Sequence, residues 1–155
     1  MKYSLFLLPL FAAACLSSCG TKEQTEEQNT TSETTEAAAP VADTSGKVIE
    51  LTDPGKLAPG VKVDRLTVVD FNAVWCGPCR QLAPVLTEMA QKYAGKADFI
   101  SVDVDKYGEL MYAWNLGQSI PVVLFLKPDG TSSHYVGTGD LLPADKFDAL
   151  IKANL

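Results

Sequence analysis

Hydrophobic positions change their spacing along the chain near residue 75. Just before this point, residues 66–71 form a short and nearly continuous apolar run, which is typical of a strand buried inside a sheet. From Pro78 onward, apolar residues recur three or four positions apart, at Leu82, Val85, Leu86, Met89 and Tyr93. This spacing places them on one face of an amphipathic helix about four turns long. The stretch from Val68 to Pro84 is therefore predicted to begin as a strand and to end as a helix.

The other apolar patterns predict further strands and helices in alternation. We expect strands at residues 48–52, 99–104, 121–126 and 132–136. We expect helices at residues 106–114 and from Pro143 onward, whereas the prolines and glycines of residues 53–64 allow only a short or irregular helix. Pro128, Asp129 and Gly130 form a turn that joins the last two strands as a hairpin. The alternation and the closing hairpin indicate an α/β fold with a central mixed sheet flanked by helices.

The first 46 residues have a different pattern. A basic residue followed by the apolar residues 5–14 resembles a secretory signal, and this run is shorter than the roughly 20 residues of a membrane-spanning helix. The sequence Leu-Ser-Ser-Cys at residues 16–19 resembles the lipobox of bacterial lipoproteins, in which cleavage precedes the cysteine and its sulfur receives a lipid. The alternatives are a weaker register at Cys15 and cleavage of an ordinary signal peptide. We expect a signal peptide at residues 1–18, lipidation of Cys19 and anchoring to a membrane outside the cytoplasm.

Charge is concentrated between this leader and the rest of the chain. The chain has a formal net charge of −6, and residues 20–46 carry one Lys against five Glu and one Asp. The same segment has almost no large apolar side chain, so it cannot bury enough surface to fold. We expect residues 19–46 to be a flexible acidic tether and residues 47–155 to be the folded domain. Neither part has a basic patch, which argues against nucleic-acid binding.

Cys76 and Cys79 are the two cysteines of the expected domain, and the pattern places them at the start of the predicted helix. Unpaired N–H groups and the positive end of the helix dipole favour a thiolate at such a place. We expect an exposed Cys76 with a lowered pKa, which attacks first, and a more buried Cys79, which acts second. Pro78 suits the first turn of the helix, and Gly77 allows a tight turn. A bridge across so short a loop would stabilise the fold little, so the pair is interpreted as redox-active.

Asp70 is an acidic residue inside the apolar run that precedes the cysteines. Burial in such a strand disfavours the charged form, so the pKa of its carboxyl group should be raised. The simpler alternative is a hydrogen-bonded carboxyl group without an effect on the reaction.

Taken together, these residues resemble the active site of thioredoxin. Residues 75–79 read Trp-Cys-Gly-Pro-Cys, with Val-Asp-Phe at residues 69–71 and Ala-Pro at residues 83–84, all at the spacing of that family. Further matches follow at Ile120 and Pro121, at the turn of residues 128–130, and at Val136 and Gly137. The resemblance covers roughly residues 47–155 and implies the thioredoxin fold.

The resemblance also implies roles for single residues. Asp70 would handle the proton of the reaction, and Pro121 would follow a cis peptide bond. An extended substrate backbone would dock on a surface formed by Trp75, Gly77, Pro78, Ile120, Pro121 and Gly137, with ordinary partial burial as the alternative for Trp75. The implied activity is thiol–disulfide oxidoreduction, with the reduction of disulfides in extracytoplasmic proteins as the leading hypothesis. We expect neither a cofactor nor a metal.

The sequence departs from the usual thioredoxin pattern at several positions, and two of these departures concern the surroundings of Asp70. Asn72 stands where the family usually has tryptophan, so a bulky apolar cover near the site is absent. Ser101 aligns with a position that is often lysine, and without a nearby cation Asp70 should be harder to ionise. These departures leave the redox potential and the choice of partner open.

Three alternatives to a general reductase use the same cysteines. A disulfide oxidase or isomerase needs no other residues, and neither does a dedicated reductant for cytochrome c maturation. A metal-binding module is the third, but zinc usually takes four ligands, and the one histidine, His134, is expected on the surface. A reductase outside the cytoplasm needs a source of electrons. We therefore expect disulfide-containing proteins and a membrane electron-transfer protein as partners.

Overall fold

The computed structural model describes residues 45–155, and the fold discussed below is that of this segment. The predicted signal peptide at residues 1–18, the predicted lipidation site Cys19 and residues 20–44 of the predicted tether lie outside the described residues. Within residues 45–155, no helix is both long enough and apolar enough to cross a membrane.

Five strands of the described segment form a mixed sheet in the order β1-β3-β2-β4-β5. They are β1 (Val48–Glu50), β2 (Leu66–Asn72), β3 (Ala97–Asp103), β4 (Val122–Leu126) and β5 (Ser132–Val136). β1 and β2 run parallel to β3, whereas β4 is antiparallel to both β2 and β5. All of β4 and all but the last residue of β2 are buried, as expected for inner strands that are covered on both faces. The predicted mixed sheet is confirmed.

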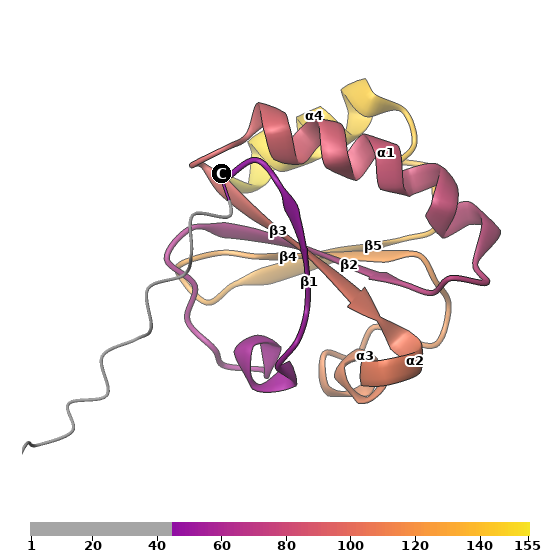
Figure 1. The fold of residues 1–155 in the computed structure, drawn as a ribbon. Helices are drawn as coiled ribbons and strands as arrows, with labels where there is room; N and C mark the ends of the chain where they lie inside the picture. Colours follow the sequence, from indigo (N-terminus) through magenta and orange to yellow (C-terminus); the bar gives the residue numbers. More distant parts are fainter. Residues whose placement is uncertain (1–44) are drawn as a thin grey trace, which may run out of the picture. The chain divides into compact units, whose positions relative to one another are not determined.

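Helices cover both faces of the sheet (Figure 1). One face carries α1 (Gly77–Lys92) and α4 (Ala144–Asn154), and the other carries α2 (Val104–Tyr107), α3 (Glu109–Ala113) and the 3-10 helix η1 (Pro54–Leu57). The core under α1 and α4 includes Phe125 and Phe147, whose rings meet edge to face. The core on the other face includes Phe71 and Leu110. β2 is thus held between two apolar layers, and this fixes the point from which the loop to α1 departs.

Some boundaries differ from the prediction. β1 ends at Glu50 rather than at residue 52. β3 ends at Asp103, whose carboxylate accepts a hydrogen bond from the N–H of Asp105 at 3.0 Å, so Val104 begins α2 instead of extending the strand. The helix predicted for residues 106–114 is interrupted between α2 and α3 at Gly108, a residue type with low helix propensity. The short helix expected within residues 53–64 is present as η1.

A polar cluster around Asp148 of α4 fixes the C-terminal end of α1. Its carboxylate accepts a hydrogen bond from the Tyr93 hydroxyl at 2.6 Å and pairs with Lys92 at 2.7 Å and Lys152 at 2.8 Å. Hydrogen bonds from Lys152, Lys92 and Tyr93 hold the pKa of Asp148 well below its usual range. α1 is therefore held against α4 at the end that lies away from the cysteines.

Candidate active site

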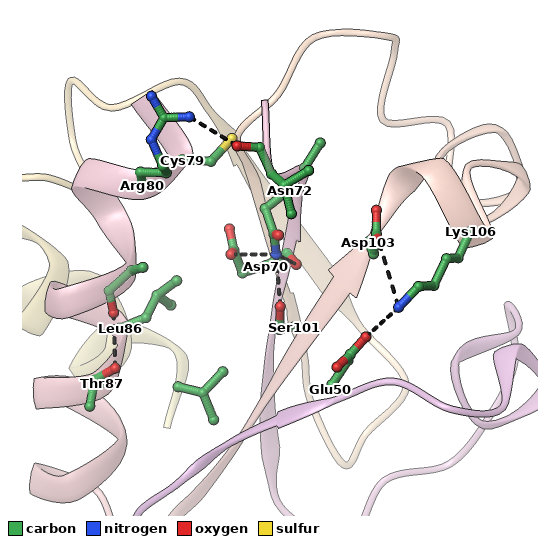
Figure 2. A pocket seen from close by; sticks show the side chains of 14 residues that line it. Glu50, Asp70, Asn72, Cys79, Arg80, Leu86, Thr87, Ser101, Asp103 and Lys106 are labelled. Carbon is green, nitrogen blue, oxygen red and sulfur yellow. Dashed lines mark hydrogen bonds and ion pairs between the residues drawn. The ribbon is translucent and has the colours of Figure 1, made fainter. Parts of the chain in front are cut away.

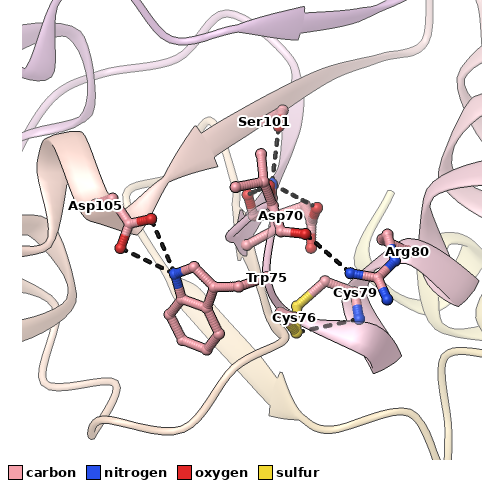
Figure 3. The surroundings of a disulfide bond; sticks show 9 residues. Asp70, Trp75, Cys76, Cys79, Arg80, Ser101 and Asp105 are labelled. Atoms are coloured by element: carbon pink, nitrogen blue, oxygen red, sulfur yellow. Dashed lines mark hydrogen bonds between the residues drawn. A yellow bond between two sulfur atoms is a disulfide. The ribbon is translucent and has the colours of Figure 1, made fainter.

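The two cysteines lie where β2 passes into α1. Cys76 is the N-cap residue of α1, and its sulfur accepts a hydrogen bond from the backbone N–H of Cys79 at 3.2 Å. Pro78 occupies the first turn, where its missing N–H costs no helical hydrogen bond. Cys76 and Cys79 are joined by a disulfide (Figure 3). The helix N-terminus thus presents a donor to the first sulfur, as the sequence predicted.

The expected exposure of Cys76 is wrong in this disulfide form. Its side chain belongs to a small apolar cluster with Ala73 and Cys79, against which Ile120 packs. Cys76 is 5% exposed and Cys79 is 3% exposed. The position at the start of α1 does not expose the sulfur, because the neighbouring loop before β4 packs against it.

Side-chain hydrogen bonds hold the loop before Cys76 in place. The indole N–H of Trp75 donates to both carboxylate oxygens of Asp105, at 2.9 and 3.2 Å. The Arg80 guanidinium donates to the carbonyl of Val74 at 2.9 Å. The contact of Asp105 with Trp75 was not predicted from the sequence, although Asp105 follows β3, which is parallel to β2. The carboxyl ends of parallel neighbours meet at one edge of the sheet, and this rule could have found it.

The residues expected to dock a substrate backbone lie around the disulfide. The peptide bond between Ile120 and Pro121 is cis, as the resemblance implied. The carbonyl of Pro121 accepts a hydrogen bond from the N–H of Gly137 at 2.8 Å, so these two segments are held together. Trp75 is 64% exposed, and Pro78 is also exposed. The structure therefore gathers exposed apolar surface beside the sulfurs.

Asp70 lies in β2 and is only 4% exposed. Burial raises the pKa of its carboxyl group to about 7, and a hydrogen bond from Asn72 opposes this rise. The direction agrees with the prediction, because desolvation of the charged form dominates. Ser101 lies opposite Asp70 on the neighbouring strand β3, in agreement with the match to the thioredoxin pattern that placed it beside this aspartate. Asp70 can therefore hold or release a proton near neutral pH.

An open cleft lies beside Asp70 and Cys79 (Figure 2). Its volume is about 610 Å³, and its walls come from β1, β2, β3, α1 and α2 and from the loop after β2. Asn72 and Ser101 line it, at two of the positions where the sequence departs from the usual thioredoxin pattern. The small polar residues at these positions thus leave open space beside the buried carboxyl group.

No metal site is evident in the described part of the chain. Residues 45–155 contain no group of three or more His, Cys, Asp or Glu side chains placed to hold an ion. His134 lies on β5 and is exposed.

Comparisons with known proteins agree with this geometry. The family model described as Thioredoxin matches residues 55–153. The chain belongs to the thioredoxin family. A thioredoxin of Borreliella burgdorferi is 39% identical over 89 residues, which cover 57% of this chain and 73% of that protein. Thioredoxin C-2 of Corynebacterium nephridii is 32% identical over 111 residues, which cover 72% of this chain and 99% of that protein.

Solved thioredoxin structures have the same fold. Chloroplastic thioredoxin z matches with a TM-score of 0.58 and 26% identity, covering 69% of this chain and 93% of that one. The germline-specific thioredoxin Deadhead of Drosophila melanogaster matches with a TM-score of 0.52 and 30% identity, covering 59% of this chain and 83% of that one. This thioredoxin is therefore a thiol–disulfide oxidoreductase that acts on disulfide-containing proteins, and Cys76 and Cys79 form its disulfide.

The order in which the two cysteines act predicts which variant traps a substrate. If Cys76 attacks and Cys79 resolves, reduced Cys79→Ser should accumulate a mixed disulfide with a disulfide-bonded protein such as insulin, because no second thiol releases it. Non-reducing electrophoresis of the full-length protein measures the adduct. Cys76→Ser is the matched control, since it keeps every other cysteine and should form no such adduct. An adduct with Cys76→Ser but not with Cys79→Ser would reverse the assignment.

Proposed function

We propose that this thioredoxin reduces disulfides of proteins outside the cytoplasm, with Cys76 as nucleophile and Cys79 as resolving residue. The observation that carries the proposal is the N-cap position of Cys76, whose sulfur receives the Cys79 N–H, with buried Asp70 behind the pair. A thiolate at a helix N-terminus is a good attacking and leaving group. The Gly-Pro dipeptide between the cysteines is the one found in the reducing thioredoxins that the sequence resembles.

The reaction transfers two electrons from the dithiol to the substrate. The Cys76 thiolate attacks one sulfur of the substrate disulfide, and the other sulfur leaves as a thiolate that takes a proton from water. Cys79 then loses its proton to the Asp70 carboxylate, and its sulfur bonds to that of Cys76. The bond between Cys76 and the substrate breaks, and the second substrate sulfur leaves as a thiolate that takes up the proton held by Asp70, which restores the carboxylate. The substrate gains two electrons and two protons, and the protein is left in the disulfide form.

The reduction potential decides between a reductase and an oxidase. We expect a value near the roughly −270 mV of thioredoxin, because the dipeptide between the cysteines is the same, and not near the roughly −120 mV of a strong periplasmic oxidant. Titration of the full-length protein against a dithiol buffer gives this value, with Cys76→Ser as the blank. A potential close to that of the oxidants would contradict this proposal and would indicate that the protein forms or isomerises disulfides.

We propose that the protein is a lipoprotein anchored through Cys19 on the outer side of a bacterial membrane. The lipobox-like residues 16–19 and the preceding apolar run support this location. Several acyl chains on one residue would give firm anchoring. Metabolic labelling with a fatty acid should mark the wild-type protein and Cys15→Ala but not Cys19→Ala. Label that persists in Cys19→Ala would contradict lipidation at this residue.

An extracytoplasmic reductant also needs a supply of electrons. We propose a membrane protein that carries electrons outward and reduces the disulfide between Cys76 and Cys79. Deletion of such a carrier should convert the pair from mostly reduced to mostly oxidised, as measured by alkylating free thiols in intact cells. A pair that stays reduced after every candidate carrier is deleted would contradict this source of electrons.

A further inference from the structure

The carboxamide of Asn72 links Asp70 of β2 to Ser101 of β3. Its nitrogen donates to Oδ2 of Asp70 at 2.9 Å and to the hydroxyl oxygen of Ser101 at 2.8 Å, and it lies 3.2 Å from the backbone carbonyl of Asp70. Figure 2 shows the amide between the carboxyl group and the serine, at the wall of the cleft. Asn72 is therefore tied to both strands, and its side chain has a defined orientation.

This arrangement leaves the two carboxyl oxygens of Asp70 unequal. Oδ2 is bonded to Asn72, whereas Oδ1 has no hydrogen-bond partner. Among the described residues, it is the only buried side-chain nitrogen or oxygen without one. A buried acceptor without a partner costs free energy, so such an atom calls for an explanation. A free oxygen beside Cys79 is the place where a proton from that thiol can bind.

The other charged groups around the cleft are engaged elsewhere. Lys106 pairs with Glu50 at 2.7 Å and with Asp103 at 3.7 Å, and Arg80 donates to a backbone carbonyl. Glu50, Arg80, Asp103 and Lys106 come from β1, α1, β3 and α2, and all four line the cleft without a hydrogen bond or ion pair to Asp70. Within residues 45–155, Asn72 is thus the side chain that donates to this carboxyl group.

We propose that Asn72, anchored on Ser101, is a positioning residue for the resolving step: it holds Oδ2 of Asp70 and keeps Oδ1 free to receive the proton of Cys79. The inference rests on the proposed function of Cys76, Cys79 and Asp70. A donor to the carboxylate stabilises its charged form. Asn72 therefore keeps enough of the carboxylate present near neutral pH for the transfer, at a site without a paired cation.

Direct titration of Asp70 tests this role. The side-chain carboxyl resonance of Asp70 is followed by carbon-13 NMR in the oxidised full-length protein, in which Cys76 and Cys79 are disulfide-bonded and do not titrate. Asn72→Leu keeps the shape of the side chain but removes the donor, so the midpoint should rise by about one pH unit, the size expected for one hydrogen bond to a charged group. Ser101→Ala removes the anchor and should raise the midpoint by less.

Thr87→Val is the matched control, because Thr87 lines the same cleft and its hydroxyl donates to the carbonyl of Ala83 rather than to Asp70. The midpoint of Asp70 should not move in this variant. Unchanged midpoints in Asn72→Leu and Ser101→Ala, or an equal rise in Thr87→Val, would overturn the inference. Ser101→Ala alters a side chain that is only part-buried, so it provides a folded test if Asn72→Leu fails to fold.

The rate of the resolving step gives a second readout. At pH values below the Asp70 midpoint, Asn72→Leu should resolve a mixed disulfide on Cys76 about tenfold more slowly than the wild-type protein does. The pH dependence of this rate should shift to higher pH, together with the midpoint measured by NMR. A decrease in this rate by the same factor at all pH values would indicate a structural effect and would overturn the inference. If the wild-type protein does not reduce disulfides at all, the proposed function fails, and that result is distinct from unchanged midpoints in an active protein.

Discussion

The hydrogen bond from the Cys79 N–H to the Cys76 sulfur is the interaction on which the site depends. It exists because a short loop leads from the buried strand β2 into α1, and the first N–H groups of that helix have no helical acceptor. The apolar layers on both faces of β2 hold the strand before this junction, and the cluster at Asp148 holds the far end of the helix that follows it. The reactive sulfur is placed by the fold as a whole.

The parallel pairing of β2 with β3 brings the other polar side chains of the site to the edge of the sheet where both strands end. Asp70 is opposite Ser101 and Asn72 is opposite Asp103 in the register of the two strands. Asp105 follows β3 and receives the indole N–H of Trp75, which follows β2. Contacts between residues about thirty positions apart therefore arise from one pairing of strands.

Much of this arrangement could be predicted from the chain, because local patterns control it. The apolar run ending at Phe71 and the helical spacing after Pro78 were sufficient to place the cysteines at a helix start. Non-local packing decided what was missed. Cys76 is buried because Ile120 packs against its cluster, and the break at Gly108 separates residues whose local pattern is helical throughout. The bond from Asn72 to Ser101 required the register of two strands, which spacing alone does not supply.

Burial of Asp70 also ties the reaction to the folding stability of the domain. An aspartate in the unfolded chain ionises near its ordinary pKa of 3.8, whereas burial raises the pKa of Asp70 in the fold to about 7. Between these values the folded protein keeps a proton that the unfolded chain has released, so the contribution of this group to stability falls as the pH rises through the interval. Above the upper value the fold contains a buried negative charge that has a hydrogen bond from Asn72 but no paired cation among the described residues. The residue best suited to accept a proton at neutral pH is thus also one that weakens the folded state there.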